Sequence, residues 1–222
     1  MGPGHLGIGL ALKRVDRRLN AGWLVFAAYL LDFLLGIFVL LGLEQVRVPP
    51  DLPARHYFLY SFPYSHSLVA SLGWSALAAL IAYAAVRGTA AARRLAALTI
   101  GAAVFSHFLL DVVVHVPEIP IAGASSPRLG LGLWNHLPLA LGLEAALVAI
   151  GLALYLGAGR ARAPVGRHGM VLFAGAMTIM MLMGQATLVA APPPAVLAAG
   201  WILQSAGISL VVYWLDTQRT PA

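Results

Sequence analysis

Residues 95–116 are LAALTIGAAVFSHFLLDVVVHV. A helix that crosses the hydrocarbon core of a bilayer needs about 20 predominantly apolar residues, and this stretch has that length and character. It nevertheless contains His107, Asp111 and His115, and ionisable side chains inside a membrane are costly unless they serve a task. The stretch therefore predicts a membrane-spanning helix that carries part of a functional site.

Five further apolar runs of comparable length lie near residues 21–43, 65–87, 133–157, 169–191 and 195–215. Prolines follow the first and third runs and separate the last two, as expected where helices end. The sequence predicts an all-α fold: a polytopic membrane bundle of about six transmembrane helices that forms a single integral membrane domain over residues 1–222.

The composition also points to a lipid bilayer as the main partner, because 60% of the residues are hydrophobic and only 10% are charged. The chain has 14 Lys and Arg against 8 Asp and Glu, an excess that in a soluble protein would suggest nucleic acid. Here the basic residues lie in short segments between the apolar runs. We therefore expect them to set the membrane topology, and we expect no nucleic-acid partner.

The distribution of basic residues predicts the orientation. With a cytoplasmic N-terminus, only Arg47, Arg55 and Arg128 of the 14 Lys and Arg residues would lie outside. This distribution follows the positive-inside rule over every short loop. We therefore expect both termini in the cytoplasm and a multi-pass protein of the cell inner (plasma) membrane.

Three parts are expected within the domain. Residues 1–20 are predicted to be a cytoplasmic segment, in which Leu6, Leu10 and Leu12 beside a basic end suit a short amphipathic helix on the inner membrane surface. A frayed tail is the alternative. Residues 21–160 would form a four-helix core with a metal site. Residues 161–222 would form a two-helix scaffold that offers a surface for an oligomer, because its apolar runs carry no ionisable residue.

Histidines and carboxylates gather toward one end of the first four runs. His107, Asp111 and His115 repeat at i, i+4 and i+8 and so share one helix face. The other three runs add Asp32, His66, His136 and Glu144. The chain has no cysteine, so a metal would be held by His and carboxylate ligands, which suit Zn²⁺, Mn²⁺ or Fe²⁺.

We interpret this constellation as a site for a divalent metal, with zinc the first candidate. The predicted metal ligands, the first three preferred, are His66, His107, Asp111, His115 and His136. Asp32 and Glu144 are the candidate general bases. Alternatively, the same side chains satisfy one another in a structural network between helices.

The segment 44–64 follows the first run and is rich in Tyr and Phe. It has two possible roles: a lid over a cavity, or an anchor at the membrane surface, where aromatic side chains are enriched.

Two short signatures carry a family resemblance: His66-Ser67 at the start of one run, and Ser106-His107 followed by Asp111 in the next. With these, and with GLGLWN at residues 130–135, the first 160 or so residues resemble the bacterial inner-membrane metal-dependent hydrolases. The resemblance implies a divalent metal held by His66, His107 and Asp111 and a hydrolytic reaction. Better-known members also have an Asp-rich motif followed by His-Arg, which this chain lacks, and Asp32 is the carboxylate available in its place.

Three functions are consistent with these features. The first is a hydrolase that acts on a lipid-linked or apolar substrate. The second is a transporter of protons or divalent metal, which would need a polar path to the cytoplasm, whereas the inner halves of the runs are nearly all Ala, Leu, Val and Gly. The third is a non-catalytic membrane protein in which the cluster holds a structural metal.

Overall fold

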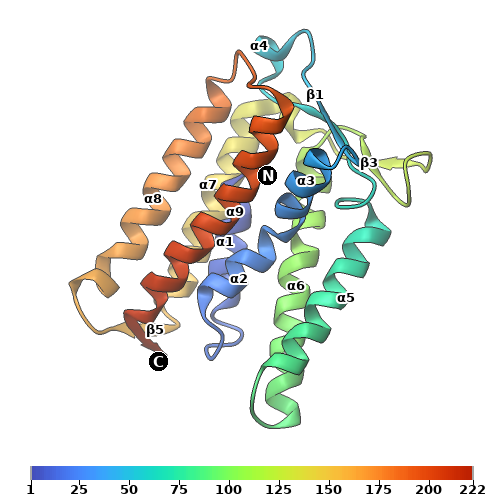
Figure 1. Cartoon of the computed structure of the whole chain (residues 1–222). Helices are drawn as coiled ribbons and strands as arrows, with labels where there is room; N and C mark the ends of the chain where they lie inside the picture. Colours follow the sequence, from blue (N-terminus) through green and yellow to red (C-terminus); the bar gives the residue numbers. More distant parts are fainter. Residues whose placement is uncertain (1, 222) are drawn as a thin grey trace.

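The computed structural model describes residues 2–221 and is a bundle of long helices (Figure 1). The long helices are α5 (Leu68–Ala85), α6 (Ala90–Val114), α7 (Leu137–Leu156), α8 (Pro164–Ala186) and α9 (Pro194–Thr217). Among the described residues, five helices are long and apolar enough to cross a membrane, or six if one bent pair counts as a single span. The prediction of an all-α, multi-pass membrane bundle is confirmed.

The bent pair corresponds to the first predicted span. It consists of α2 (Ala21–Ala28) and α3 (Leu30–Leu40), which meet at an angle of 51°. Tyr29 lies at the break with φ −98° and ψ 3°, outside the helical region. Asp32 lies in the first turn of α3, where the positive end of the helix dipole favours a carboxylate. The break therefore places a helix N-terminus and an acidic side chain inside the bundle.

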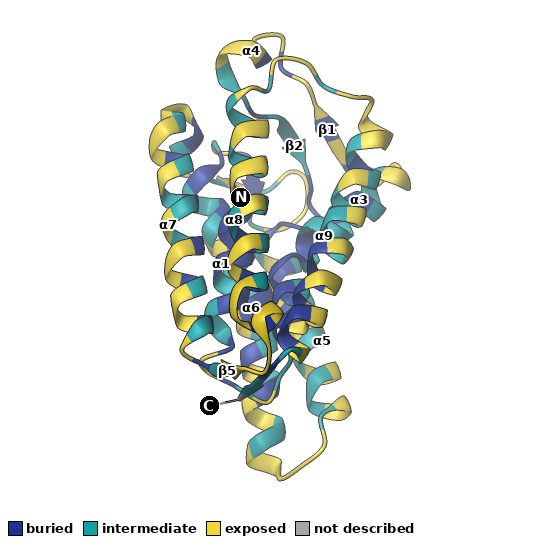
Figure 2. Cartoon of the chain, turned by 90° about the vertical axis from the view of Figure 1, so that its left-hand side faces the viewer, coloured by how far each residue is buried: buried dark blue, intermediate teal, exposed yellow. Residues whose placement is uncertain are grey.

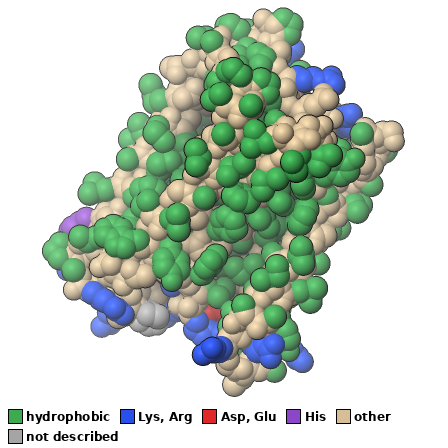
Figure 3. Space-filling model, in the orientation of Figure 1, with side chains coloured by type: hydrophobic (Ala, Val, Ile, Leu, Met, Phe, Trp, Pro, Cys, Tyr) green, Lys and Arg blue, Asp and Glu red, His purple; other side chains and the backbone are tan. Residues whose placement is uncertain are grey.

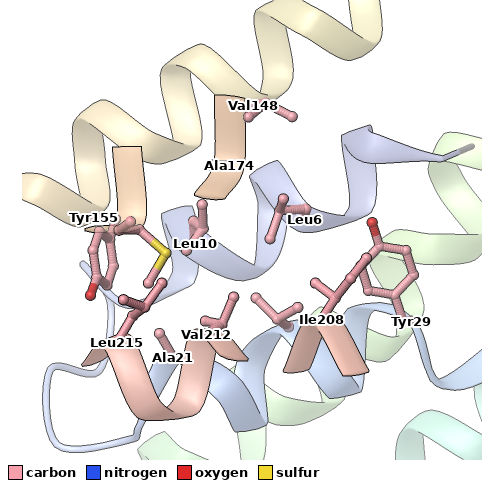
Figure 4. Packing of buried hydrophobic residues seen from close by; sticks show 12 residues of the cluster. Leu6, Leu10, Ala21, Tyr29, Val148, Tyr155, Ala174, Ile208, Val212 and Leu215 are labelled. Carbon is pink, nitrogen blue, oxygen red and sulfur yellow. The ribbon is translucent and has the colours of Figure 1, made fainter. Parts of the chain in front are cut away.

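The N-terminal helix α1 (Pro3–Leu12) lies inside the bundle, so the expectation of a helix on the membrane surface is wrong. Its Leu6 and Leu10 are fully buried, in a cluster to which α7 contributes Val148 and Tyr155 and α9 contributes Ile208, Val212 and Leu215 (Figure 4). The residues of α1 itself are mostly apolar or small on every side of the helix, so the helix has almost no amphipathic character. A helix with this pattern is stabilised by burial on every face.

Glycines allow α1 to approach α7 closely. A Cβ atom at Gly151 of α7 would collide with the carbonyl oxygen of Gly7 in α1, and one at Gly7 would collide with the carbonyl oxygen of Leu147. Contacts between small residues let helix backbones pack tightly where lipid leaves little hydrophobic driving force between helices. The position of α1 therefore depends on residues without side chains on both helices.

Three short antiparallel strand pairs tie the loops together. The pair β1 (Gln45–Arg47) with β2 (Leu59–Ser61), which encloses α4 (Leu52–Arg55), and the pair β3 (Ile119–Pro120) with β4 (Arg128–Leu129) lie at one end of the bundle (Figure 1). The short 3₁₀ helix η1 (Leu133–His136) leads into α7. The third pair, β5 (Gly159–Ala161) with β6 (Arg219–Pro221), lies at the opposite end beside the C-terminus.

The outward faces of the helices are apolar, as a lipid environment requires. Leu98, Leu172 and Leu203 are each more than 70% exposed on three different helices. Exposed residues follow the outer sides of the helices in Figure 2, and hydrophobic side chains cover most of the face seen in Figure 3. On that face the Lys and Arg side chains gather mainly at the end that holds the C-terminus. We refer to it below as the basic end.

Candidate metal centre

Four ligand atoms converge at the end of the bundle opposite the basic end. The Nε2 atoms of His66 and His107 are 3.2 Å apart. Asp111 Oδ2 lies 3.2 Å from His107 Nε2 and 3.5 Å from His66 Nε2. Asp32 Oδ1 lies 3.7 Å from each of the two Nε2 atoms. His66 precedes α5, whereas Asp32 belongs to α3 and His107 and Asp111 to α6, so three segments of the chain meet here.

These separations fit a tetrahedrally bound cation. With metal–ligand bonds of about 2.1 Å, neighbouring ligand atoms of a regular tetrahedron lie about 3.4 Å apart. The distances among the ligand atoms of His66, His107 and Asp111, 3.2 to 3.5 Å, are close to that value. His66, His107 and Asp111 form a buried group that could hold a metal ion, as predicted, and Asp32 lies beside its two histidines without belonging to that group.

A hydrogen bond from the opposite ring nitrogen orients each of the two histidines. His107 Nδ1 lies 2.7 Å from the carbonyl oxygen of Ala28, next to the break between α2 and α3. His66 Nδ1 lies 2.7 Å from Ser65 Oγ, which donates to Glu44 Oε2 at 2.6 Å. Both Nδ1 atoms therefore carry the proton, and both Nε2 lone pairs face the cluster, which is the arrangement found in metal-bound histidines.

Two lone pairs that face each other at 3.2 Å repel, so this arrangement needs a positive charge between them. A proton or a metal ion would meet that need. The carboxylates of Asp32 and Asp111 add negative charge at the same point, which favours a divalent cation over a single proton.

Glu44 anchors the His66 side of the cluster from the loop that follows α3. Its Oε1 atom accepts the backbone N–H groups of Tyr64 and Ser65 at 2.7 and 2.8 Å. Burial raises the pKa of the Glu44 carboxyl above its usual value, against the opposing effect of the hydrogen bonds from Ser65. Glu44 thus fixes both the backbone and the hydroxyl that precede His66.

His115 faces the cluster from the cavity side. Its Nδ1 atom is 2.7 Å from Glu118 Oε1, and its Nε2 atom is 3.8 Å from Asp111 Oδ2. Glu118 is buried and also accepts the backbone N–H of Tyr60 at 2.7 Å. A histidine whose far nitrogen is bound to a carboxylate is well placed to exchange protons at the near one.

His5 of α1 is a site residue that the sequence analysis missed. Its ring is fully buried and stacks on the His107 ring at 3.7 Å between centroids, and its Nε2 atom is 3.5 Å from Asp111 Oδ1. With Asp32 and His107 it forms a second, overlapping group that could hold a metal ion. The burial of α1 brings His5 to this position.

Two predicted site residues lie away from the cluster. His136 is exposed at the end of η1 and belongs to neither group of ligand atoms found among the described residues. Glu144 is fully buried on α7, where its Oε2 atom accepts the backbone N–H of Gly4 at 3.4 Å. It therefore supports the start of α1, and it is not among the residues that line the cavity over the cluster.

A cavity of about 270 Å³ opens onto the cluster. Asp32, His66, Asp111 and His115 form its polar floor, and aromatic side chains of the segment 56–62 form much of its wall. Segment 56–62 therefore covers the cluster, as the lid interpretation of residues 44–64 requires. Gln185 of α8 and Gln204 of α9 also line the cavity, so the last two helices contribute to the site besides serving as a scaffold.

Comparison with known proteins adds no family to this picture: no family model, no curated protein and no solved structure matches the chain. The conclusions about the site therefore rest on its own geometry. The molecule is a multi-pass membrane protein with a buried His/Asp cluster that could bind a metal ion.

Proposed function

We propose that the protein is a metal-dependent hydrolase embedded in the cell inner membrane, with its site near the outer face. The observation that carries the proposal is the convergence of ligand atoms from His66, His107 and Asp111 at 3.2–3.5 Å beside a cavity. The hydrolytic reaction is also what the resemblance to inner-membrane metal-dependent hydrolases implies.

The donor set fits a divalent metal, with Zn²⁺ the first candidate and Mn²⁺ or Fe²⁺ as alternatives. Such an ion would supply Lewis-acid chemistry, which polarises a carbonyl or phosphoryl oxygen and makes water more acidic. His66, His107 and Asp111 would hold it, as three protein ligands that leave a further position open. The residue nearest to the open side is Asp32, whose side chain is 24% exposed, whereas the other three are nearly inaccessible.

His115 supplies the proton transfer that hydrolysis of an ester or amide requires. Its Nε2 atom accepts a proton from a water molecule in the cavity while the water oxygen bonds to the carbonyl carbon. The bond to the leaving group then breaks, and the same proton passes to the leaving oxygen or nitrogen. Glu118 holds the His115 ring in its orientation. This assigns to His115 the role that the sequence suggested for Asp32 or Glu144.

The packing below the cluster weighs against a transporter of protons or metal. The buried apolar cluster around Leu6 and Leu10 lies along α1 toward the basic end and includes Val148, Ile208 and Val212. A conducting path would need polar groups or water across this region. We therefore rank hydrolysis above transport.

Metal binding is the part of the proposal to test first. The protein is purified in mild detergent without chelator and incubated with Zn²⁺ or Mn²⁺, and bound metal is measured by mass spectrometry. We expect near-stoichiometric metal in the wild type, loss in His107→Ala/Asp111→Ala, and retention in His136→Ala, which changes an exposed histidine outside the cluster. A wild type that retains no metal would refute the metal-dependent part of the proposal.

Hydrolysis is tested with a panel of long-chain esters and amides presented in vesicles. In the metal-loaded protein, His115→Gln should lower the rate by about 10²–10⁴-fold, the usual contribution of a general base. Metal content should remain at the wild-type level, because His115 is not one of the three grouped ligands. An unchanged rate would exclude His115 as the proton acceptor.

A further inference from the structure

Segment 56–62, which forms much of the cavity wall, is held by three hydrogen bonds on the side away from the basic end. His56 Nδ1 lies 3.1 Å from the carbonyl oxygen of Leu188, in the loop between α8 and α9. Tyr57 donates its hydroxyl proton to Asn135 Oδ1 at 2.7 Å, and the Tyr60 N–H is held by Glu118. These bonds hold segment 56–62 against η1, the α8–α9 loop and the segment after α6.

The side of the cavity, in contrast, is open at Gly184, near the end of α8. Gly184 both lines the cavity and is exposed, and a Cβ atom placed there would meet no atom within 4 Å. The neighbouring Met180 and Met183 are 59% and 58% exposed, and Val189 is 60% exposed. The opening is therefore surrounded by apolar surface of the kind that faces lipid.

The walls of the cavity carry no cationic side chain: no Lys or Arg is among the described residues that line it. The carboxylates in it, Asp32 and Asp111, belong to the metal cluster. In the part of the cavity away from the cluster, a phosphate or carboxylate headgroup would lose its hydration without gaining a Lys or Arg partner, which is unfavourable. Gln185, which follows Gly184, and Gln204 of α9 also line the cavity, and their amides offer neutral donors and acceptors.

The size of the cavity limits what it encloses. At about 270 Å³ it is at the lower edge of the range of about 300–1,000 Å³ for pockets that bury a drug-sized ligand. It has room for a headgroup and the bond to be cleaved, and the long acyl chains of a lipid would stay outside, in the bilayer.

We propose that an uncharged lipid enters the site sideways from the outer half of the bilayer, past Gly184, and that Gln185 and Gln204 bind its headgroup. This names the substrate class of the hydrolase proposed above and rests on that proposal: a fatty acyl ester or amide whose headgroup carries no negative charge. The acyl chains remain in lipid while the ester or amide group reaches the cluster.

The test measures occupancy directly, so that it does not depend on turnover. Protein reconstituted in vesicles is exposed to diacylglycerol or to phosphatidic acid, each with a photoactivatable diazirine on one acyl chain, and crosslinked residues are mapped by mass spectrometry. We expect diacylglycerol to label α8 and α9 residues at the opening and phosphatidic acid to label them at least about tenfold less.

A matched pair of glycine variants on α8 tests the route. Gly184→Leu places a side chain in the opening, whereas Gly175→Leu adds the same side chain to the same helix, also in open space, away from the cavity. Labelling by diacylglycerol should fall by about tenfold or more in Gly184→Leu and stay unchanged in Gly175→Leu. Bound metal and thermal stability, measured in parallel, show that both variants are folded.

Three results would overturn the inference: no labelling at the opening in the wild type, equal labelling by phosphatidic acid, or equal labelling in Gly184→Leu. Failure of the hydrolase proposal has a different signature. If the cavity binds diacylglycerol past Gly184 but no ester or amide is cleaved, lipid entry is supported and hydrolysis is refuted.

Discussion

At the scale of single residues, the cluster owes its geometry to atoms that would never touch a metal. The Nδ1 atoms of His66, His107 and His115 each lie 2.7 Å from an oxygen atom. The three oxygens have different chemistry, since they belong to a hydroxyl, a backbone carbonyl and a carboxylate. Each leaves the Nε2 atom turned toward Asp111. These partners fix the rotation of each imidazole ring. They therefore set the direction in which each Nε2 atom points.

Ser65 is the residue at which this control is tested most cleanly. Ser65→Ala removes the hydroxyl that holds His66 Nδ1 and links it to Glu44. We expect metal affinity to fall by about 10–100-fold, as is typical when such an orienting partner is lost. Affinity is measured in detergent by competition with a chromophoric chelator.

Ser71→Ala is the control for Ser65→Ala. Ser71 is also buried and lies six residues further on, but its hydroxyl has no hydrogen-bond partner among the described residues. This variant should bind metal as the wild type does. Equal affinities in all three proteins would show that the Ser65–Glu44 link does not orient His66.

The sequence predicted part of this cluster. The i, i+4 repeat placed His107 and Asp111 on one helix face, and the preference for His66 as their partner agrees with the structure. His5 and Glu44 were missed because no spacing links them to α6, and only tertiary packing brings them near. His136 and Glu144 occupy one short stretch of sequence with plausible residue types, yet the turn of η1 and the packing of α1 direct them elsewhere.

At the scale of helices, the close packing of α1 against α7 is sensitive to any added side chain. Gly151→Ala would push a methyl group into the backbone of Gly7, where neither helix has a flexible side chain that could move aside. Overpacking of this kind costs about 1–3 kcal/mol. We expect a lower unfolding temperature in detergent and weaker metal binding, because His5 is carried on α1.

Gly142→Ala, on the same helix, is the matched control for Gly151→Ala. A Cβ atom at Gly142 would meet nothing within 4 Å. Alanine has the higher helix propensity, by about 0.8–1.0 kcal/mol, so this variant should be as stable as the wild type or more so. If Gly151→Ala were equally stable, the close packing of α1 on α7 would not be a determinant of stability.

The helices themselves were largely predictable, since long apolar runs are a strong signal in a membrane protein. Two features were not. A short helix was predicted within residues 1–20, but its burial was not, because a window of about 20 residues detects only helices long enough to cross the membrane. No Pro or Gly lies next to Tyr29 that would have predicted the break from the sequence. It coincides with the hydrogen bond between Ala28 and His107, a contact between residues 79 positions apart.

At the scale of the whole molecule, the Lys and Arg side chains seen in Figure 3 gather mainly at one end of the bundle, and the buried cluster lies toward the other. A buried ion pair lies at the basic end, where Lys13 Nζ is 2.8 Å from Asp216 Oδ2. The same carboxylate oxygen accepts the backbone N–H of Ala21 at 3.0 Å. The pair joins the end of α1 to the end of α9. Lys13, one of the basic residues predicted for the inner face, therefore has a structural role in addition to any role in setting the topology.

The orientation is tested with introduced cysteines, because the natural chain has none. Ala124→Cys lies in the loop between β3 and β4, and Ala90→Cys lies at the start of α6; both positions are exposed. A membrane-impermeant maleimide should label the first in intact cells and the second only after permeabilisation. The reverse pattern would invert the topology and place the cavity on the cytoplasmic side.

The buried position of α1 also has a consequence for how the protein is made. A helix of 10 residues is about 15 Å long, roughly half the thickness of the hydrocarbon core, so α1 cannot cross a bilayer alone. Its partners α7 and α9 begin at Leu137 and Pro194 and leave the ribosome long after it. During synthesis α1 has to wait outside the bundle until both are inserted. This helix is thus placed later than the helices around it, and His5 joins the His/Asp cluster only when it docks.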